Sequence, residues 1–248
     1  MQKALGLGIQ LGVQSMIPGL GNPRSLLYYG MSCDGGDYGT GSTPVFSGTD
    51  QTDDFTVTAW IKPGALFFDS AYHTIYESVG EFFFRRDTND DISFLILNGT
   101  SLVKFPDTDL TAGVWAHVAV TYDGTGDDHL KMYLNGVLVD TDETVGDWSN
   151  TSPTDTISQS LNGPWIGELF DIRLFNGVAA TIDEIGYIMR GIYADGRETA
   201  RYVSFTDADA TIVDSASDGT HNVTNAAGAA AMTKTGPYYT IDAALGPQ

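Results

Sequence analysis

Glu168 and Asp171 are the two residues of this chain that most resemble a catalytic pair in their type and spacing. Glycoside hydrolysis needs two acids flanking the scissile bond, about 5 Å apart in retaining enzymes and farther apart in inverting ones. Side chains alternate between the two faces of a strand, so positions 168 and 171 should face opposite sides. No third acid follows at a spacing that would complete a catalytic set. We therefore expect no catalytic site, and a glycoside hydrolase is the least favoured function.

The four histidines offer no alternative catalytic group. His117 lies inside an alternating apolar segment, where a buried structural role is expected. His73, His129 and His221 lie in or near predicted loops, and the sequence indicates no partner for them. The chain has no cysteine and histidine spacing suited to zinc, and no glycine-rich phosphate loop between a strand and a helix.

Two acidic segments have the oxygen-rich composition that calcium prefers. Neither has the spacing of an EF-hand loop, and each is also typical of a solvated turn, which is the default expectation. Calcium is the one cofactor that the sequence leaves open. The candidate ligands are Asp207, Asp209, Asp214 and Asp218 in one segment, and Asp87, Asn89, Asp90 and Asp91 in the other.

The polar segment from Thr141 to Thr156 contains the candidate ligand-binding residues. Sugars are commonly held by aromatic faces together with a few hydrogen bonds from amides or carboxylates. Trp148 lies among polar residues with Asp147 and Asn150, so we expect an exposed ring. The ring would serve either as a lid over the edge of the core or as a contact to a glycan.

Residues 1–27 form an arm with a different pattern from the rest of the chain. Its glycines and glutamines interrupt any continuous apolar stretch, so a removed export signal is not expected. A strand with one apolar face invites pairing. We expect the arm to pack on a neighbouring sheet or subunit, with folding back onto its own domain as the alternative. The apolar side consists of Leu5, Leu7, Ile9, Leu11 and Val13.

Residues 114–141 predict three consecutive antiparallel strands. From Trp115 to Tyr122 the side chains alternate, and both faces of this strand look covered. The glycine-rich run 123–128 should close a first hairpin. Asn135-Gly136, the strongest short hairpin signal, should then reverse the chain into a third strand. Upstream, the three phenylalanines at 82–84 cannot all face inward on one strand, so both of its faces must be covered.

The same segment carries a family resemblance. The block W-A-H-V-A-V-T-Y-D-G at 115–124, followed by Y-L-N-G at 133–136, resembles the laminin-G-like branch of the concanavalin A-like lectin/glucanase fold. The resemblance extends over about residues 30 to 240, and its other blocks follow in the family's order. These blocks lie at 32–38, 55–63, 165–176, 181–185 and 202–219. The resemblance further implies that Asp171 and Arg173 share a face and form a structural pair, and that His117 has a structural role in the core or at an interface.

The resemblance implies an all-β, two-sheet antiparallel β-sandwich of jelly-roll type, with one short helix and the N-terminal strand-like arm. Composition agrees, because 248 residues with 42% hydrophobic content can bury one sizeable core, and 29 glycines supply many turns. Thr181 and Glu184 form a capping box that should begin the helix. We expect an arm at 1–27, the sandwich at 28–240 and a C-terminal tail at 241–248.

The charge of the chain excludes some partners. Thirty-two acids against 12 bases give a net charge of -20 at pH 7. Nucleic-acid binding needs basic surface, so it is not expected, and an anionic membrane is equally disfavoured. The single cysteine, Cys33, excludes an intramolecular disulfide and should pack as a small apolar residue.

These features favour a non-catalytic structural or adhesive protein. We predict a virion component, such as a capsid decoration or tail-associated protein, that docks on other particle proteins or on copies of itself through its arm. The alternative is a secreted or surface lectin that binds carbohydrates, including host-surface glycans. The fold serves both roles, so the resemblance alone does not separate them.

Overall fold

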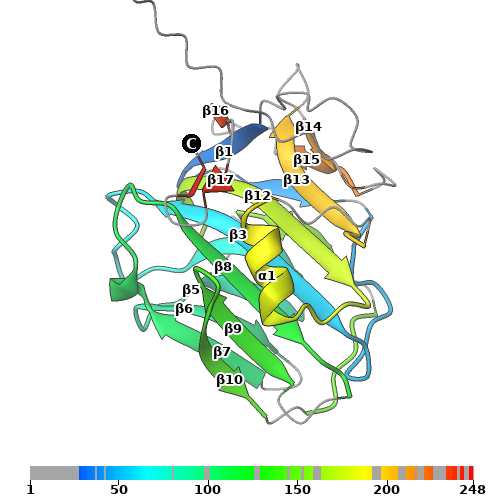
Figure 1. The fold of residues 1–248 in the computed structure, drawn as a ribbon. Coiled ribbons are helices and arrows are strands. Elements are labelled where there is room, and N and C mark those ends of the chain that lie inside the picture. Colours follow the sequence, from blue (N-terminus) through cyan, green and yellow to red (C-terminus); the bar gives the residue numbers. More distant parts are fainter. Residues whose placement is uncertain are drawn as a thin grey trace, which may run out of the picture.

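The computed structural model describes residues 28–36, 38–41, 43–79, 81–97, 101–125, 129–143, 146–151, 154–158, 163–191, 197–205, 211–214, 216, 221–225, 233–238, 241–242 and 246–247. They form two antiparallel β-sheets packed face to face, with one α-helix and one short 3₁₀ turn at Asp107–Asp109 (Figure 1). This confirms the predicted all-β sandwich with one short helix.

The front sheet is built around its longest strand, β12 (Ile166–Asn176), which pairs with β1, β3 and β13. Its strand order is β10-β9-β8-β3-β12-β13, with β1 also beside β12 and β16 beside β1. The other strands are β1 (Tyr28–Asp34), β3 (Phe55–Pro63), β8 (Ala116–Tyr122), β9 (Leu130–Leu134), β10 (Val137–Asp142), β13 (Ala200–Phe205) and β16 (Thr233–Tyr238).

The back sheet has the order β14-β15-β2-β11-β4-β5-β6-β7. β13 pairs with β14, so the hydrogen-bonded ladder passes from one sheet to the other at this side of the sandwich. β17 (Ile241–Asp242) and β18 (Gly246–Pro247) form a separate pair in the predicted C-terminal tail. The back strands are β2 (Gly39–Gly41), β4 (His73–Ser78), β5 (Phe82–Arg86), β6 (Asp91–Ile96), β7 (Ser101–Pro106), β11 (Asp155–Ile157), β14 (Thr211–Asp214) and β15 (Val223–Asn225).

The hairpin between β9 and β10 follows the sequence prediction. Asn135 and Gly136 both have positive φ, at 51° and 76°, as a tight type I′ turn requires. β8 pairs with β9 and β9 pairs with β10 in antiparallel register. The three strands predicted from residues 114–141 are therefore confirmed.

A side-chain latch joins the two sheets at the side opposite β13 and β14. β10 lies beside β7 there. The carboxylates of Asp142 and Asp140 on β10 accept hydrogen bonds from the backbone N–H groups of Leu102 and Lys104 on β7, each at 2.9 Å. Backbone amides at the edge of the back sheet are thus satisfied without a further strand.

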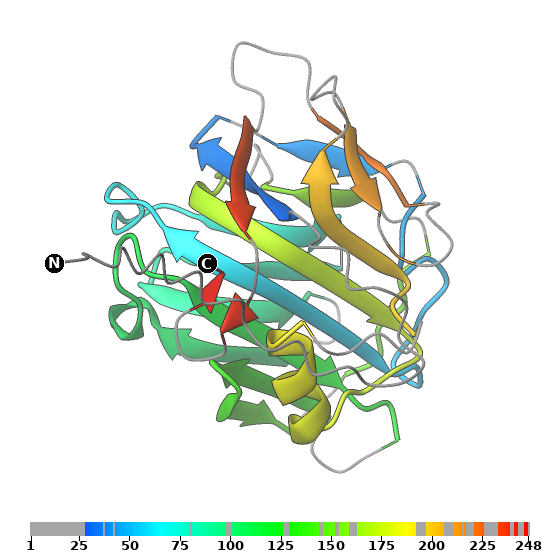
Figure 2. The same ribbon diagram turned by 45° about the horizontal axis from the view of Figure 1, so that its top comes forward.

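α1 (Ile182–Met189) covers the outer face of the front sheet, as Figures 1 and 2 show. Thr181 and Glu184 form the expected capping box, which satisfies backbone N–H groups at the helix start. Ile185 and Ile188 are buried against Tyr133 and Phe175 in a second apolar cluster. Both faces of the front sheet are therefore partly covered, as the pattern of β8 predicted.

The main core lies between the sheets and is unusually rich in aromatic rings. Phe55, Phe82 and Tyr122 are fully buried, with Phe55 and Tyr122 stacked at 5.0 Å between ring centroids. Phe82 and Phe84 face this core, whereas Phe83 lies on the opposite face of β5. The prediction that the three phenylalanines at 82–84 need cover on both sides of the strand is confirmed.

Trp148 belongs to the same core, so the expectation of an exposed ring was wrong. It is 2% exposed and packs edge-on against Phe82 and Tyr122, at 5.0 and 5.5 Å between centroids. Its indole N–H donates to the Tyr122 hydroxyl at 3.4 Å. The prediction was wrong because the residues beside Trp148 in the sequence are polar, while the ring itself points into the core. The lid alternative is the one that the structure supports.

Replacement of this ring gives a direct test of its core position. Trp148→Ala should lower the free energy of unfolding by about 3–5 kcal/mol, because it removes a buried aromatic ring and leaves a cavity. The neighbouring Asp147 is exposed, so Asp147→Ala should change it by less than about 0.5 kcal/mol. Urea unfolding followed by circular dichroism measures both. Equal effects would contradict the core assignment.

Candidate functional site

The carboxylates of Glu168 and Asp171 lie on the same face of β12, contrary to the parity argument that placed them on opposite faces. Phe170 is opposite Trp60 and Arg173 is opposite Thr58, so two residues of β12 lie opposite one residue of β3. This β-bulge contains Asp171, whose φ is 47°, a left-handed value that is uncommon for a residue other than glycine. The extra residue reverses the alternation beyond position 170.

Each of these carboxylates is nevertheless neutralised by its own cation. Glu168 lies opposite Lys62 on β3, and its Oε1 is 2.6 Å from the Lys62 ammonium. Asp171 is buried and accepts two hydrogen bonds from Arg173, at 3.0 and 2.7 Å. The predicted structural pair of Asp171 and Arg173 is confirmed.

Asp171 is the centre of a buried ion network on the outer face of the front sheet. Arg201 on β13 donates to it at 2.7 Å, and Arg173 also bonds to Glu198 at 3.1 Å. Burial alone would raise the pKa of Asp171, but the charges of Arg173 and Arg201 outweigh burial and hold the pKa well below its usual range. The carboxylate is thus a permanent anion that ties β12 to β13.

His117 has the structural position that the sequence predicted. Its ring is 1% exposed and packs edge-on against Trp60 at 5.3 Å. Nδ1 is buried without a hydrogen-bond partner. Burial lowers its pKa to about 3, with Asp171 opposing the shift and Arg173 adding to it. A histidine held neutral in this way cannot serve as a proton shuttle near neutral pH.

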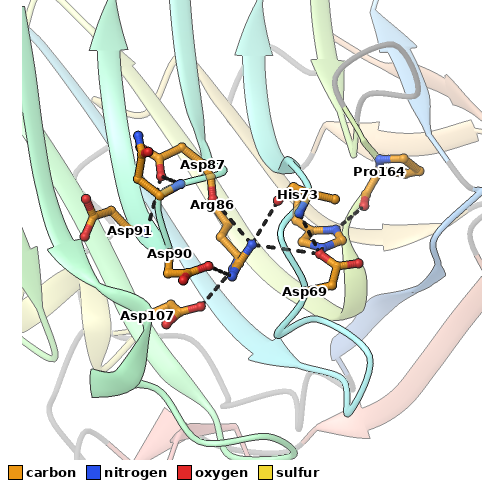
Figure 3. A network of polar contacts seen from close by, with 10 residues as sticks. Asp69, His73, Arg86, Asp87, Asp90, Asp91, Asp107 and Pro164 are labelled. Atoms are coloured by element: carbon orange, nitrogen blue, oxygen red, sulfur yellow. Dashed lines mark hydrogen bonds and ion pairs between the residues drawn. The ribbon is translucent and has the colours of Figure 1, made fainter.

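The acidic turn at 87–91 is neutralised from inside the protein by the guanidinium of Arg86 (Figure 3). Arg86 is 1% exposed, and its guanidinium bonds to the buried Asp107 at 2.8 Å and to Asp90 at 2.5 Å. On the outer side of the same turn, Lys104 bonds to Asp91 at 2.5 Å. Carboxylates that were candidate calcium ligands are thus engaged by Arg86 and Lys104.

A neighbouring pair extends the Arg86 network. Asp69 accepts a 2.8 Å hydrogen bond from His73, whose other ring nitrogen is 3.0 Å from the Pro164 carbonyl (Figure 3). Burial alone would raise the pKa of Asp69, but the His73 hydrogen bond and the Arg86 charge lower it. His73 is therefore partnered, although the sequence indicated no partner.

The other candidate ligands give no metal site in the part of the chain that the structure describes. Asp207, Asp209 and Asp218 lie outside the described residues, as does the side chain of Asp214 on β14. Within the described ranges, no group of three or more histidine, cysteine, aspartate or glutamate side chains is placed to hold a metal ion.

The predicted glycan contacts near Trp148 differ in their exposure to solvent. Asn150 is 3% exposed, and its side-chain amide donates to Ser78 at 2.9 Å inside the protein. Asp147 is exposed and lines a hollow of about 400 Å³ with Gln51 and Ser149. Trp148 also borders this hollow but offers almost no ring surface. These residues therefore do not form an aromatic binding platform.

An aromatic surface with an available cation lies instead on the outer face of the back sheet. The Arg85 guanidinium lies over the rings of Tyr72 and Phe83, at 4.2 and 4.8 Å from their centroids. Arg85 and Tyr72 are half-buried, and Phe83 is 9% exposed. We call these three residues the Arg85 stack. Stacking on a ring face holds a planar guanidinium in a fixed orientation.

The hydrogen-bonding capacity of the Arg85 stack is unused. Nε of Arg85 is buried without a partner, and no described residue forms a hydrogen bond or ion pair with its side chain. Thr74, opposite Arg85 on β4, and Thr156 on β11 also have buried hydroxyls without partners. Buried polar groups are normally satisfied, so these groups need a partner that the described residues do not supply.

The strand register places two different rows of side chains on this face. Phe83, Leu95 and Leu102 lie opposite one another on β5, β6 and β7 and form an apolar row. The parallel row, two residues along each strand, contains Arg85, Ser93 and Lys104. Ser93 is buried and donates to the Arg85 carbonyl, and Lys104 is paired with Asp91, so Arg85 is the donor of this row that a ligand could engage. An apolar row beside such a donor suits a ligand with both characters.

Sequence reasoning missed this surface for a physical reason. It detected that the three phenylalanines at 82–84 could not all face the core, but not that Arg85 would share the outer face with a ring from the segment before β4. Tyr72 reaches the stack through tertiary folding, which strand alternation does not report. Only the outward position of Phe83 could have directed attention to β5.

Comparison with known proteins agrees with this architecture, that of a lectin-like β-sandwich. The chain matches the family model described as Laminin_G_3, of the concanavalin A-like lectin/glucanases superfamily, over residues 34–186. It therefore belongs to this family. A search of curated protein sequences found no significant match.

Two solved structures illustrate the likeness in fold. A proposed carbohydrate-binding protein from Bacteroides ovatus has a TM-score of 0.63 and 20% identity, over 88% of this chain and 62% of its own. The present chain thus spans less than two thirds of that protein. A SAP-like pentraxin from Limulus polyphemus, a heptamer, has a TM-score of 0.52 and 17% identity, over 67% of this chain and 83% of its own. Among the described residues, no helix is both long and apolar enough to span a bilayer.

The Arg86 network leads to a stability prediction. Arg86→Met should lower the free energy of unfolding by about 3–5 kcal/mol, because it leaves the buried Asp107 carboxylate without its cation. Lys104→Met removes a cation of the same charge from an exposed pair and should cost at most about 1 kcal/mol. Chemical denaturation at pH 7 compares the two variants. A cost for Lys104→Met as large as that for Arg86→Met would refute the distinction.

His117 leads to a prediction about pH. The unfolded chain takes up the proton near pH 6.5, whereas the folded chain does so only near pH 3. Stability from this residue is thus complete above pH 6.5 and falls as the pH decreases toward 3, by about 1.4 kcal/mol per pH unit. Between pH 6.5 and 4, the unfolding free energy of His117→Gln should change less steeply with pH than that of the intact chain. The difference in slope should correspond to about one proton. Parallel slopes for the two proteins would show that His117 titrates normally when folded.

Proposed function

We propose that this chain is a non-catalytic carbohydrate-binding domain whose binding surface is the outer face of the back sheet. The observation that carries the proposal is the Arg85 stack, where a guanidinium with no carboxylate partner among the described residues lies over two aromatic rings. Membership of a lectin-like family supports it, although the fold alone also serves other functions.

The chemistry of the surface suits a sugar. A pyranose ring has an apolar C–H face that can pack on an aromatic or aliphatic row, and hydroxyls that need fixed hydrogen-bond partners. Phe83, Leu95 and Leu102 provide the apolar row. Arg85 offers N–H donors in a fixed fork.

The absence of paired acids in the described hollows supports a non-catalytic role. Three hollows on the described surface, of about 300, 420 and 400 Å³, each have one carboxylate in their lining. These carboxylates are Glu168, Asp123 and Asp147, respectively. A glycosidase needs two carboxyl groups facing one cleft. Binding without hydrolysis is therefore the activity that this surface favours.

The role in a virus particle stays a prediction. It depends on the arm, and Leu5, Leu7, Ile9, Leu11 and Val13 lie outside the described residues. The glycan proposal does not need the arm, because its binding surface lies within the sandwich. A domain with this function would work where polysaccharides are present, on a cell or particle surface or in a secreted protein.

The proposal is tested with a glycan array and a matched pair of variants. The intact chain should bind a subset of the printed oligosaccharides, and Tyr72→Ala should weaken binding by about tenfold or more, since aromatic contacts contribute about 1–3 kcal/mol. The control is Tyr187→Ala. Tyr187 also lies under an arginine, with the Arg190 guanidinium 5.3 Å from its ring, but on α1 at the opposite side of the sandwich.

The outcomes separate clearly. Loss of binding in Tyr72→Ala with unchanged binding in Tyr187→Ala supports the back-sheet surface. Equal loss in both variants, or no binding of any oligosaccharide by the intact chain, would refute the proposed function.

A further inference from the structure

We infer that the Arg85 stack selects a sugar residue that carries a carboxylate, such as a uronic or sialic acid, over its neutral counterpart. This inference rests on the proposed function and concerns the class of glycan bound at the same surface. Arg85 has no carboxylate partner among the described residues, although the chain has an excess of acids.

The described cations are almost all neutralised within the chain. Lys62 pairs with Glu168, Lys104 with Asp91, and Arg197 with Glu184. Arg86, Arg173 and Arg201 are held in the buried networks around Asp107 and Asp171. Acids outnumber bases by 32 to 12, so carboxylate partners are plentiful. A half-buried arginine that has none is therefore exceptional here.

Arg85 is such a residue. No described carboxylate forms an ion pair with it, and its contacts are the ring faces of Tyr72 and Phe83. Arg190 also lacks a carboxylate partner among the described residues, but its Nε donates to the Gly186 carbonyl at 2.8 Å. Arg85 has no such acceptor among the described residues. Its Nε is buried, so the terminal guanidinium nitrogens are the donors that a ligand could engage.

A carboxylate is the group that matches these donors best. A guanidinium presents paired N–H groups that bind both oxygens of a carboxylate at once. Stacking fixes the plane of the guanidinium, which reduces the entropy lost when the ligand binds. A hydroxyl of a neutral sugar also accepts one of these hydrogen bonds, but without charge assistance. A preference of about 10- to 100-fold for the acidic sugar is expected from one such pair.

The net charge of the chain limits the kind of acidic glycan. A charge of -20 repels anions at long range, although salt at 0.15 M screens exposed charges beyond about 8 Å. The second cation of this face, Lys104, is already neutralised by Asp91. The surface therefore suits a glycan with an isolated carboxylate seated at Arg85, rather than a dense polyanion such as heparin.

The experiment uses an array of neutral, uronic-acid-containing, sialylated and sulfated oligosaccharides printed in two copies. Carboxyl groups on one copy are reduced to hydroxymethyl groups, which removes the charge and keeps the sugar ring. The intact chain should bind carboxylate-bearing spots on the untreated copy at least tenfold more strongly than the same spots after reduction. Three variants are compared on the bound oligosaccharides by titration calorimetry.

Arg85→Gln and Lys104→Gln change the net charge equally but only Arg85→Gln removes the stacked guanidinium. Arg85→Gln should abolish the preference for the acid form, whereas Lys104→Gln should keep it. Arg85→Lys keeps the positive charge but not the paired N–H groups of the guanidinium. It should therefore keep only part of the preference for the acid form. The inference is overturned if the bound spots are neutral or sulfated, if both Gln variants lose the preference equally, or if Arg85→Gln weakens both forms by one factor. In each of these cases glycan binding itself still stands. Failure to bind any spot would refute the proposed function and this inference together.

Discussion

The balance of charge around Asp171 is the interaction on which the front sheet depends. This carboxylate lies in a strained backbone conformation inside a sheet, where an unpaired charge would be very costly. Arg173 and Arg201 remove that cost and connect the longest strand to β13. The bulge at Asp171 thereby determines which side chains of β12 face the core and which lie beneath α1. The packing of Trp60, His117 and Phe170 on that outer face follows from it.

The two outer faces of the sandwich differ in the way that their cations are paired. On the front sheet, the buried ion network lies beside the apolar contacts that hold α1. On the back sheet, Arg86 neutralises a turn from within, while Arg85, its neighbour in sequence, points to the other side and has no carboxylate partner among the described residues. Strand alternation alone separates these two arginines. Arg86 serves stability, and Arg85 is the residue on which the proposed glycan binding depends.

Sequence patterns predicted the parts of this protein that local chemistry controls. The Asn135-Gly136 turn, the capping box at Thr181 and the alternation of β8 were all found, because each is decided by a few adjacent residues. The exposure of Trp148 was mispredicted, since polar neighbours can cover a ring as well as expose it. The faces of Glu168 and Asp171 were mispredicted because a bulge adds one residue to the count. The Arg85 stack was missed because Tyr72 joins it from a different segment.

The latch between β10 and β7 has a consequence for crowding. Open strand edges recruit strands from other molecules and so promote aggregation. Asp140 and Asp142 occupy amides at the edge of β7 and add negative charge to that edge. At high local density, the edge of β7 is therefore a poor template for strands of neighbouring copies. Crowded copies of the domain can meet at this edge while each sandwich keeps its own fold there.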